Sequence, residues 1–460
     1  MNEIAGAAPR LRLSQYLGYS AGEVANNLTF QMVAVFLLIY YTDVAGISAS
    51  LAGTLLLVVR IWGGFTDLLA GHLVDETDSR WGRFRPYLLF ASVPLLVLLV
   101  ATFSIPVRLG GSATIVWALG SYALFSLAYS FVNIPYGSLA AAMTQEPDER
   151  AKLASARAVS AGVTILLIAI AVSPQIQGSD DLQRSLTVTT ALFAVIGFAL
   201  YLWCFATSRE SVRTASAKVS VRQTAAMIRR NRPLVLLCAA TLLFLSGMFS
   251  LSTVGVFYAR DVLGNADYYI AMTAVQTLAM VAAAALVPAA VARLGKKRTY
   301  VLAGLVAAVS ALAFALAPGS VPALGIAFYG ALGIGFGAIN ALVFAFQADT
   351  VEYGEWESGV RAEGASYAVL SFTRKAGQGI GGAVAAYTIG LGGYVSGSAA
   401  QTDTAVTSIR VAAGIVPAVA VAAATLVMLA YPLSEKAFRG LVAELAERRA
   451  ARAVSAASGP

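Results

Sequence analysis

Long apolar runs recur along this chain, and they constrain its fold more than any other feature. A helix needs about 20 apolar residues to cross a hydrocarbon core roughly 30 Å thick. Hydrophobic residues make up 58% of the 460 positions and charged residues 12%, which is typical of proteins that live in lipid. Twelve runs are long enough, so we predict an all-α membrane protein with transmembrane helices at 16–42, 49–74, 86–105, 113–143, 153–175, 187–207, 233–259, 267–292, 299–317, 321–348, 363–393 and 408–432.

The Lys and Arg residues indicate how these helices are oriented. If the N-terminus is cytoplasmic, the inner segments collect most of the basic residues, and the outer loops hold only Arg108, Arg184, Arg260 and Arg410. Because basic residues favour the cytoplasmic side, both termini are predicted to be cytoplasmic. The net charge of +8 then reflects this topology and contact with anionic membrane lipid, not nucleic-acid binding. Residues 1–14 are polar and the first apolar run is too long for a cleavable signal peptide.

A polar, basic stretch at 208–232 separates six predicted spans from the next six. We therefore expect an N-terminal six-helix bundle (1–207), a cytoplasmic linker (208–232), a C-terminal six-helix bundle (233–433) and a cytoplasmic tail (434–460). Short basic turns with a glycine follow the second and eighth spans, and acid-rich connections follow the fourth and tenth. Such duplication is typical of transporters whose substrate and ion sites lie near the middle of the membrane, between the repeats.

Four segments carry a resemblance to a known family. They read YYTDVAGIS, RIW through SRWGRFRP, NIPYGSLAAAMTQEPDER and ADTVEYGEWESGVRAEGASYAVLSFTRKAG. Together, over about residues 12–435, they resemble the glycoside–pentoside–hexuronide:cation symporter family of the major facilitator superfamily. The resemblance implies two six-helix bundles, a sugar, glycoside or sugar-acid substrate, H⁺ or Na⁺ as coupling ion with no other cofactor, and alternating access in the bacterial inner membrane.

The resemblance also implies that Glu23, Arg157 and Lys375 contact the substrate. Carboxylates suit sugars because each accepts two hydroxyl hydrogen bonds, and charge-assisted bonds are about twice as strong as neutral ones. The alternative for Glu23 is an acid that favours the helix start and reaches solvent. For Arg157 it is a purely structural ion pair. Arg374 adjoins Lys375 and points about 100° away on a helix, so only one of the two should face the site.

Two departures from the family bear on the sugar. Where the best-known member of the family has an Asp and, four residues on, a Trp, this chain has Asn133 and Gly137. The changes remove a charge and an aromatic platform, and they leave room for another ring size or for a negatively charged sugar such as a hexuronide. Tyr129 and Phe125 could supply the apolar face for a sugar ring; as ordinary core aromatics they would look the same.

The resemblance makes Asp67 a cation-site carboxylate, with Thr66 and Ser130 as neutral oxygen donors. An acid at membrane depth is costly and usually functional. The alternative is a structural salt bridge to Arg60, two turns away on the same helix face. The family's second Asp, directly after RIW, is Gly63 here. A lone buried carboxylate binds a proton more readily than it completes a sodium shell, so proton coupling is favoured. The alternatives are sodium coupling, with Asp67 as the one place where a metal ion is considered, and facilitated transport without coupling.

Several other functions lack a sequence basis. The chain has no P-loop, no HExxH motif, no paired Cys and no nucleophile elbow with a His partner, so it is not predicted to be an enzyme. Cys204 and Cys238 lie in apolar runs, where free thiols are expected. His72 is assigned a structural role because it has no second ligand. We expect a monomer, and the alternatives to a symporter are a lysolipid-type facilitator carrier and a transport-inactive membrane sensor.

The cytoplasmic turns and the tail complete the predictions. Acidic residues are expected to face basic ones and to latch the two bundles together in one state: Asp75, Asp78, Glu146, Asp148, Glu149, Glu352, Glu355 and Glu357 against Arg80, Arg83, Arg85, Arg150 and Arg361. The alternative for any single member is a solvated residue that only sets the topology. The segment after Lys436 reads as a short amphipathic basic helix on the inner membrane surface, followed by a disordered end.

Overall fold

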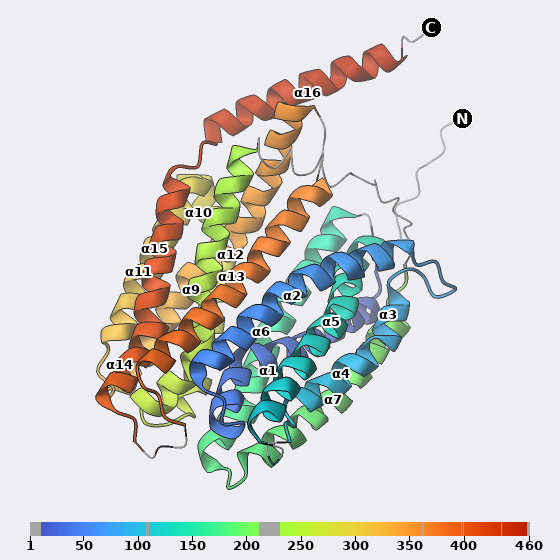
Figure 1. The fold of residues 1–460 in the computed structure, drawn as a ribbon. Helices are drawn as coiled ribbons and strands as arrows, with labels where there is room; N and C mark the ends of the chain where they lie inside the picture. The colour runs from blue at the N-terminus through green and yellow to red at the C-terminus, as the bar shows by residue number, and fades with distance from the viewer. Residues whose placement is uncertain are drawn as a thin grey trace. The chain divides into compact units, whose positions relative to one another are not determined.

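The computed structural model describes residues 11–106, 108, 110–144, 146–210, 231–359, 363–396, 398, 400–433 and 435–457, and within them the long elements are all helical (Figure 1). In chain order they are α1 (Leu13–Ile39), η1 (Tyr40–Val44), α2 (Ala49–Glu76), α3 (Arg85–Phe90), α4 (Ser92–Thr102), α5 (Gly111–Met143), α6 (Pro147–Gly178), α7 (Leu182–Thr207), α9 (Arg232–Phe257), η3 (Tyr258–Val262), α10 (Tyr268–Leu294), α11 (Lys296–Leu316), α12 (Pro322–Ser358), α13 (Glu363–Leu391), α14 (Asp403–Arg410), η4 (Val411–Ile415), α15 (Val416–Leu429) and α16 (Glu435–Ala457). The elements labelled η are single π-helical turns.

Eleven helices or helix pairs in the described residues are long and apolar enough to cross a membrane. Each coincides with a predicted span, although the tenth extends to Ser358, ten residues beyond the prediction. The remaining predicted span, 363–393, falls on α13, which has 29 residues but carries Arg374 and Lys375 in its middle. Helix α13 is therefore long enough to cross a membrane, and its charged residues distinguish it from the eleven candidate spans.

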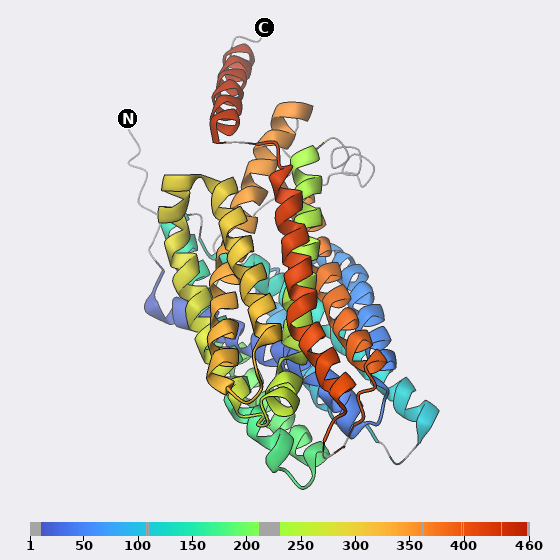
Figure 2. The same ribbon diagram turned by 90° about the vertical axis from the view of Figure 1, so that its left-hand side faces the viewer.

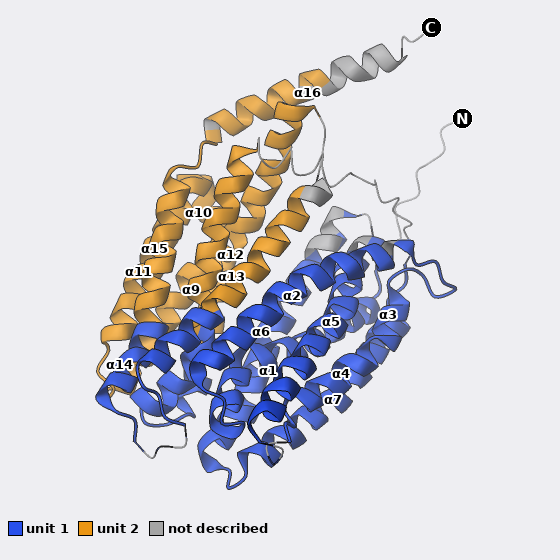
Figure 3. Ribbon diagram, in the orientation of Figure 1, with its two compact units in different colours: residues 1–216, 252–274, 382–412 blue, residues 217–251, 275–381, 413–460 orange. Residues whose placement is uncertain are grey.

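The chain divides into two compact units (Figure 3). Unit 1 comprises residues 1–216, 252–274 and 382–412, and unit 2 comprises 217–251, 275–381 and 413–460. Unit 1 thus contains the first six predicted spans together with the ends of α9 and α13, η3 and α14. We call the end of unit 1 where α1 finishes and α2 begins its distal end. The division of the sequence at 208–232 stays a prediction, since 211–230 lie outside the described residues.

Helix α1 is the centre of unit 1. It packs against α6 and α7, and most of its side chains are buried. Gly22 permits this packing, because a Cβ at that position would lie 2.6 Å from a ring carbon of Tyr136 on α5 and 2.8 Å from Cys204 Sγ on α7. The neighbouring Glu23 is buried. Both cysteines are free thiols, as predicted.

Unit 2 is built on α11, which packs against α12 and α15 (Figure 2). The final helix, α16, begins at Glu435 and contacts α12. There Trp356 Nε1 donates a 2.9 Å hydrogen bond to Glu444, and Arg448 pairs with the same carboxylate. The tail is thus a helix tied to unit 2; its predicted disordered end lies beyond the described residues.

A carboxylate closes the corresponding turn in each unit. Glu210, after α7, accepts hydrogen bonds from the backbone N–H groups of Arg83, Phe84 and Arg85 at 2.8–3.0 Å, where α3 begins. Glu435, after α15, accepts one from Lys296 N at 3.0 Å, where α11 begins. Each turn contains a glycine with positive φ, Gly82 and Gly295, placed against its carboxylate. This agreement supports the duplication indicated by the sequence.

Candidate functional site

Glu23 and Arg157 form an ion pair inside unit 1. Arg157 Nε of α6 lies 2.7 Å from Glu23 Oε2 of α1, and the Glu23 side chain is 7% exposed while that of Arg157 is 38% exposed. Asn27, one turn along α1, donates a 2.8 Å hydrogen bond to Glu23 Oε1. Within the described residues Glu23 Oε2 accepts no aligned hydrogen bond. The pair therefore neutralises a buried charge, and the more exposed Arg157 side chain is the part of it that a ligand could reach.

Asn26 joins three helices beside this ion pair. Its Nδ2 donates to Asn133 Oδ1 at 2.9 Å and to Tyr129 Oη at 3.2 Å, both on α5. Its Oδ1 accepts a 3.4 Å hydrogen bond from Tyr201 Oη of α7. Tyr129 Oη also donates to Asn133 Oδ1 at 3.5 Å. We refer to Glu23, Asn26, Asn27, Tyr129, Asn133, Arg157 and Tyr201 as the Glu23 cluster.

The aromatic residues of α5 stack on one another next to the cluster. The Tyr129 ring is stacked with Phe125 at 6.2 Å and with Phe30 of α1 at 5.7 Å. On the same face of α5, Gly137 is exposed, and a Cβ built there would meet no atom within 4 Å. The position where the best-known family member has a Trp is thus open space in this structure.

The predicted cation donors also meet. Thr66 Oγ1 of α2 and Ser130 Oγ of α5 lie 2.8 Å apart, and both residues are buried. The neighbouring Asp67 is half-buried. Asp67, Arg60, Glu23 and Arg157 all lie within electrostatic reach of the Tyr129 hydroxyl. Seven of the eight predicted site residues therefore belong to one neighbourhood of unit 1, and their roles in binding stay predictions. The described residues contain no group of three His, Cys, Asp or Glu arranged to hold a metal ion.

The eighth residue, Lys375, lies in unit 2. It is half-buried on α13. The side chain of its neighbour Arg374 contacts two residues of α12. Its guanidinium donates a 3.4 Å hydrogen bond to Asn340 and lies 5.1 Å from the ring centre of Phe344. Which member of the pair faces a site stays a prediction. Elsewhere on α12, Asp349 accepts hydrogen bonds from Lys296 Nζ through both carboxylate oxygens at 2.7 Å.

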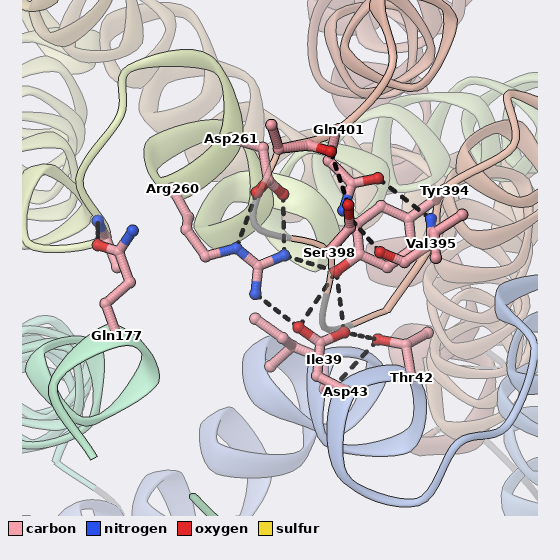
Figure 4. A network of polar contacts seen from close by, with 12 residues as sticks. Ile39, Thr42, Asp43, Gln177, Arg260, Asp261, Tyr394, Val395, Ser398 and Gln401 are labelled. Carbon is pink, nitrogen blue, oxygen red and sulfur yellow. Dashed lines mark hydrogen bonds and ion pairs between the residues drawn. The ribbon is translucent and has the colours of Figure 1, made fainter. Parts of the chain in front are cut away.

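A second polar cluster joins three segments of the chain at the distal end of unit 1 (Figure 4). Arg260 of η3 donates to Asp43 Oδ2 of η1 at 2.5 Å, to both oxygens of Asp261 at 2.9 Å and to Tyr394 Oη. Tyr394 Oη donates to Asp43 in turn, at 2.9 Å, and Thr42 Oγ1 does so at 2.7 Å. We call these five residues the distal network. It joins segments more than 200 residues apart in the sequence.

The sequence analysis did not identify the distal network, although a signal was present. Tyr40–Gly46 reads YYTDVAG and Tyr258–Gly264 reads YARDVLG, so a Y-x-x-D-V-x-G motif ends the first and seventh spans. Both motifs fold as a π-helical turn followed by a glycine with positive φ. Asn26, Asn27 and Tyr201 were also missed, because uncharged polar residues in apolar runs give no comparable signal.

The acid-rich turn before α6 makes different contacts from those expected. Glu149 accepts hydrogen bonds from Tyr16 Oη, from Leu11 N at 3.1 Å and from Lys152 Nζ at 3.0 Å. The hydrogen bonds from Tyr16 and Lys152 lower the pKa of Glu149 to about 2. The carboxylate therefore fastens the start of α1 to α6 within unit 1. Several predicted latch residues, including Arg150 and Arg361, have side chains outside the described set, and a latch between bundles stays a prediction.

Comparisons with known proteins agree with this architecture. A family model described as MFS/sugar transport protein matches residues 18–435. A glucuronide carrier protein homolog of Escherichia coli is 41% identical, over 94% of this chain and 95% of that protein. An isoprimeverose transporter of Lactiplantibacillus pentosus is 32% identical, over 95% and 92% of the two chains. The crystal structure of the nucleoside transporter NupG aligns with a TM-score of 0.65 over 92% of this chain and 100% of that one, and its 12% identity makes the likeness one of fold alone.

Proposed function

Because the chain belongs to the MFS/sugar transport protein family, it is a multi-pass membrane transporter and not an enzyme, and we propose that it imports a sugar acid or its glycoside by cation-coupled symport. The Glu23 cluster is the observation that carries this proposal. It combines a buried carboxylate, an ion-paired Arg157 whose side chain is 38% exposed and a stacked aromatic face, which are groups suited to a sugar that bears a negative charge.

The substrate class rests on charge. Asn133 replaces an acid of the best-known family member, while Arg157 and Lys375 are retained, so the site carries less negative charge than is usual in the family. A relative of 41% identity is named for glucuronide. Neither reported relative is named for a lipid, so no observation favours the lysolipid carrier, and the sensor alternative has no support either.

Transport in this proposal follows the usual plan of the superfamily. Twelve spans form two six-helix bundles in the bacterial inner membrane, both termini are cytoplasmic, and the distal end of unit 1 faces outward. Access to the substrate alternates between the two sides of the membrane, and we assign substrate binding to Glu23, Tyr129, Asn133, Arg157 and Lys375. Opposite charges on Glu23 and Lys375 make both necessary for accumulation.

Coupling is assigned to Asp67, with Thr66 and Ser130 as neighbouring oxygens. Gly63 removes one carboxylate from the usual pair, which weakens a sodium shell more than a proton site. We therefore assign the proton as coupling ion. In this assignment Asp67→Asn abolishes accumulation but leaves substrate exchange, and Gly63→Asp increases the response to sodium.

Counterflow in proteoliposomes tests the proposal directly. Proteoliposomes that contain the purified protein are loaded with one sugar. Entry of labelled glucuronides, glucosides and pentosides is then measured with a pH step or an equal sodium step. We expect entry of the glucuronide, stimulated by the pH step. Absence of counterflow with every sugar would refute the proposed function, and stimulation by sodium alone would refute the assignment of the proton.

A further inference from the structure

We propose that Asn26 is a specificity-determining residue: it holds the Asn133 amide so that its N–H groups face the ligand, and the site thereby selects an acidic sugar over its neutral counterpart. The inference rests on the proposed function. It concerns a residue that does not itself contact the substrate and that acts through the orientation of Asn133.

The hydrogen bonds of Asn133 define what it can offer. Its Oδ1 already accepts two, from Asn26 Nδ2 at 2.9 Å and from Tyr129 Oη at 3.5 Å. Asn26 makes the shorter of these two contacts, so the acceptor end of the Asn133 amide is already engaged within the protein. Within the described residues Asn133 Nδ2 donates no hydrogen bond, and the residue is half-exposed. The group of Asn133 that remains available to a ligand is therefore its Nδ2 donor.

Asn26 is itself fixed. It is 3% exposed, and all the hydrogen-bonding groups of its amide are used: both N–H groups donate to α5, and its oxygen accepts from the fully buried Tyr201. A buried amide that lost these partners would carry a substantial free-energy penalty. The α7 hydroxyl therefore orients Asn26, and Asn26 orients Asn133.

The donors select for charge. Asn133 Nδ2 and the half-exposed Arg157 guanidinium are both donors, whereas a carboxylate accepts only. Bonds to a charged acceptor are roughly twice as strong as bonds to a neutral hydroxyl. An Asp in place of Asn133 would present acceptors and repel an anion, so the Asn26–Asn133 pair reverses the hydrogen-bonding character of this part of the site.

The test compares two sugars that differ in one group, methyl glucuronide and methyl glucoside. Initial uptake by the full-length protein in proteoliposomes gives kcat/KM for each, and their ratio measures selection for the carboxylate. In Asn26→Asp the new side chain accepts only, so Asn133 must turn its N–H groups toward it and its oxygen toward the ligand. We expect the ratio to fall about tenfold or more.

Two neutral variants separate orientation from added charge. Asn26→Leu removes the contacts without a charge, and Tyr201→Phe removes only the hydroxyl that anchors Asn26; both should lower the ratio, Tyr201→Phe by about two- to threefold. Thr190→Val is the control: it is buried on α7, about three turns before Tyr201, and its hydroxyl bonds to the backbone oxygens of Leu186 and Thr187. We expect its ratio to equal that of the unaltered protein.

The outcomes are distinct. Equal loss of both sugars, with an unchanged ratio in Asn26→Leu and Tyr201→Phe, would show that Asn26 only stabilises the helices and would overturn the inference while leaving the proposed function intact. If Asn26→Asp does not fold, the two neutral variants decide. An unaltered protein that transports neither sugar would overturn the proposed function, and this inference with it.

Discussion

The Glu23 cluster and the distal network are both arginine–carboxylate assemblies of unit 1, and they differ in how fully their hydrogen bonds are used. Arg260 is 14% exposed, and its Nε and both Nη atoms donate to Asp43, Asp261 and Tyr394. Arg157 is 38% exposed, and its partner Glu23 keeps an oxygen without an aligned donor. The saturated assembly holds its helices together, whereas the unsaturated one leaves part of the Arg157 side chain exposed, where a ligand can bind.

The two Y-x-x-D-V-x-G turns show the same distinction within the distal network. Thr42 and Arg260 occupy equivalent positions, and each donates to the Asp that follows it. Arg260 has the further reach to bind Asp43 of the other turn. The difference between Thr42 and Arg260 at equivalent positions thus turns a hydrogen bond within one turn into a link between the two halves of the sequence.

The largest expected effect is on stability and comes from breaking the saturated assembly. Arg260→Gln should destabilise the folded protein by about 3–5 kcal/mol, because it leaves the buried carboxylates of Asp43 and Asp261 without their cation. Asp43→Asn should cost less, because Arg260 keeps its ion pair with Asp261. The double variant should be destabilised by less than the sum of the two. Unfolding in detergent, followed by tryptophan fluorescence, gives the three values; additive effects would show that Asp43 and Arg260 do not interact energetically.

Breaking the unsaturated assembly should affect transport most. Glu23→Gln keeps the size of the side chain and the contact with Asn27 but removes the charge, so uptake should fall about 100-fold, equivalent to about 2.7 kcal/mol. Its unfolding midpoint should stay closer to that of the unaltered protein than the midpoint of Asp43→Asn does. Lys375→Gln should likewise abolish accumulation. Normal uptake by Glu23→Gln, with membrane insertion verified, would remove Glu23 from the site.

The open side of the Glu23 cluster predicts a smaller change. Gly137→Trp fills the space next to Asn133 and should raise the KM for a glucuronide about tenfold, as expected when a binding contact is obstructed. Gly137→Ala meets no atom within 4 Å and should transport normally. The contrasting variant is Gly22→Ala, whose Cβ would lie 2.6 Å from the Tyr136 ring and should destabilise unit 1. Unchanged KM in Gly137→Trp would place the substrate elsewhere.

The smallest effect concerns Glu149, a carboxylate of unit 1 outside the membrane spans. Its pKa is lowered from 4.5 to about 2 in the folded protein. The stabilisation is therefore complete above pH 4.5 and is lost as the pH falls toward 2. Thermal unfolding should show the unaltered protein losing its advantage over Glu149→Gln across that window, with uptake near neutral pH the same in both. A constant difference at all pH values would contradict the assignment.

Much of the architecture could be predicted because it depends on local composition. Each predicted span falls on a helix, and α13 stands apart only because Arg374 and Lys375 interrupt its apolar run. The candidate residues Glu23, Tyr129, Asn133 and Arg157 were named from short motifs, and the structure brings them together. Asn26 and Tyr201 could not be named in this way, since a single amide or hydroxyl in an apolar helix looks the same whether it is oriented by a partner or not.

The sequence by itself determined that the protein lies in a membrane, where its helices run and which family it belongs to. The length of apolar runs, the bias of basic residues and the ordered motifs are all properties of contiguous residues. Only the tertiary structure decided which polar groups are satisfied. The hydrogen bond from Asn26 to Asn133 Oδ1 and the link from Arg260 to Asp43 depend on which helices pack together across more than 100 residues of chain. In a low-dielectric interior each such hydrogen bond determines what a neighbouring group has left to offer a ligand.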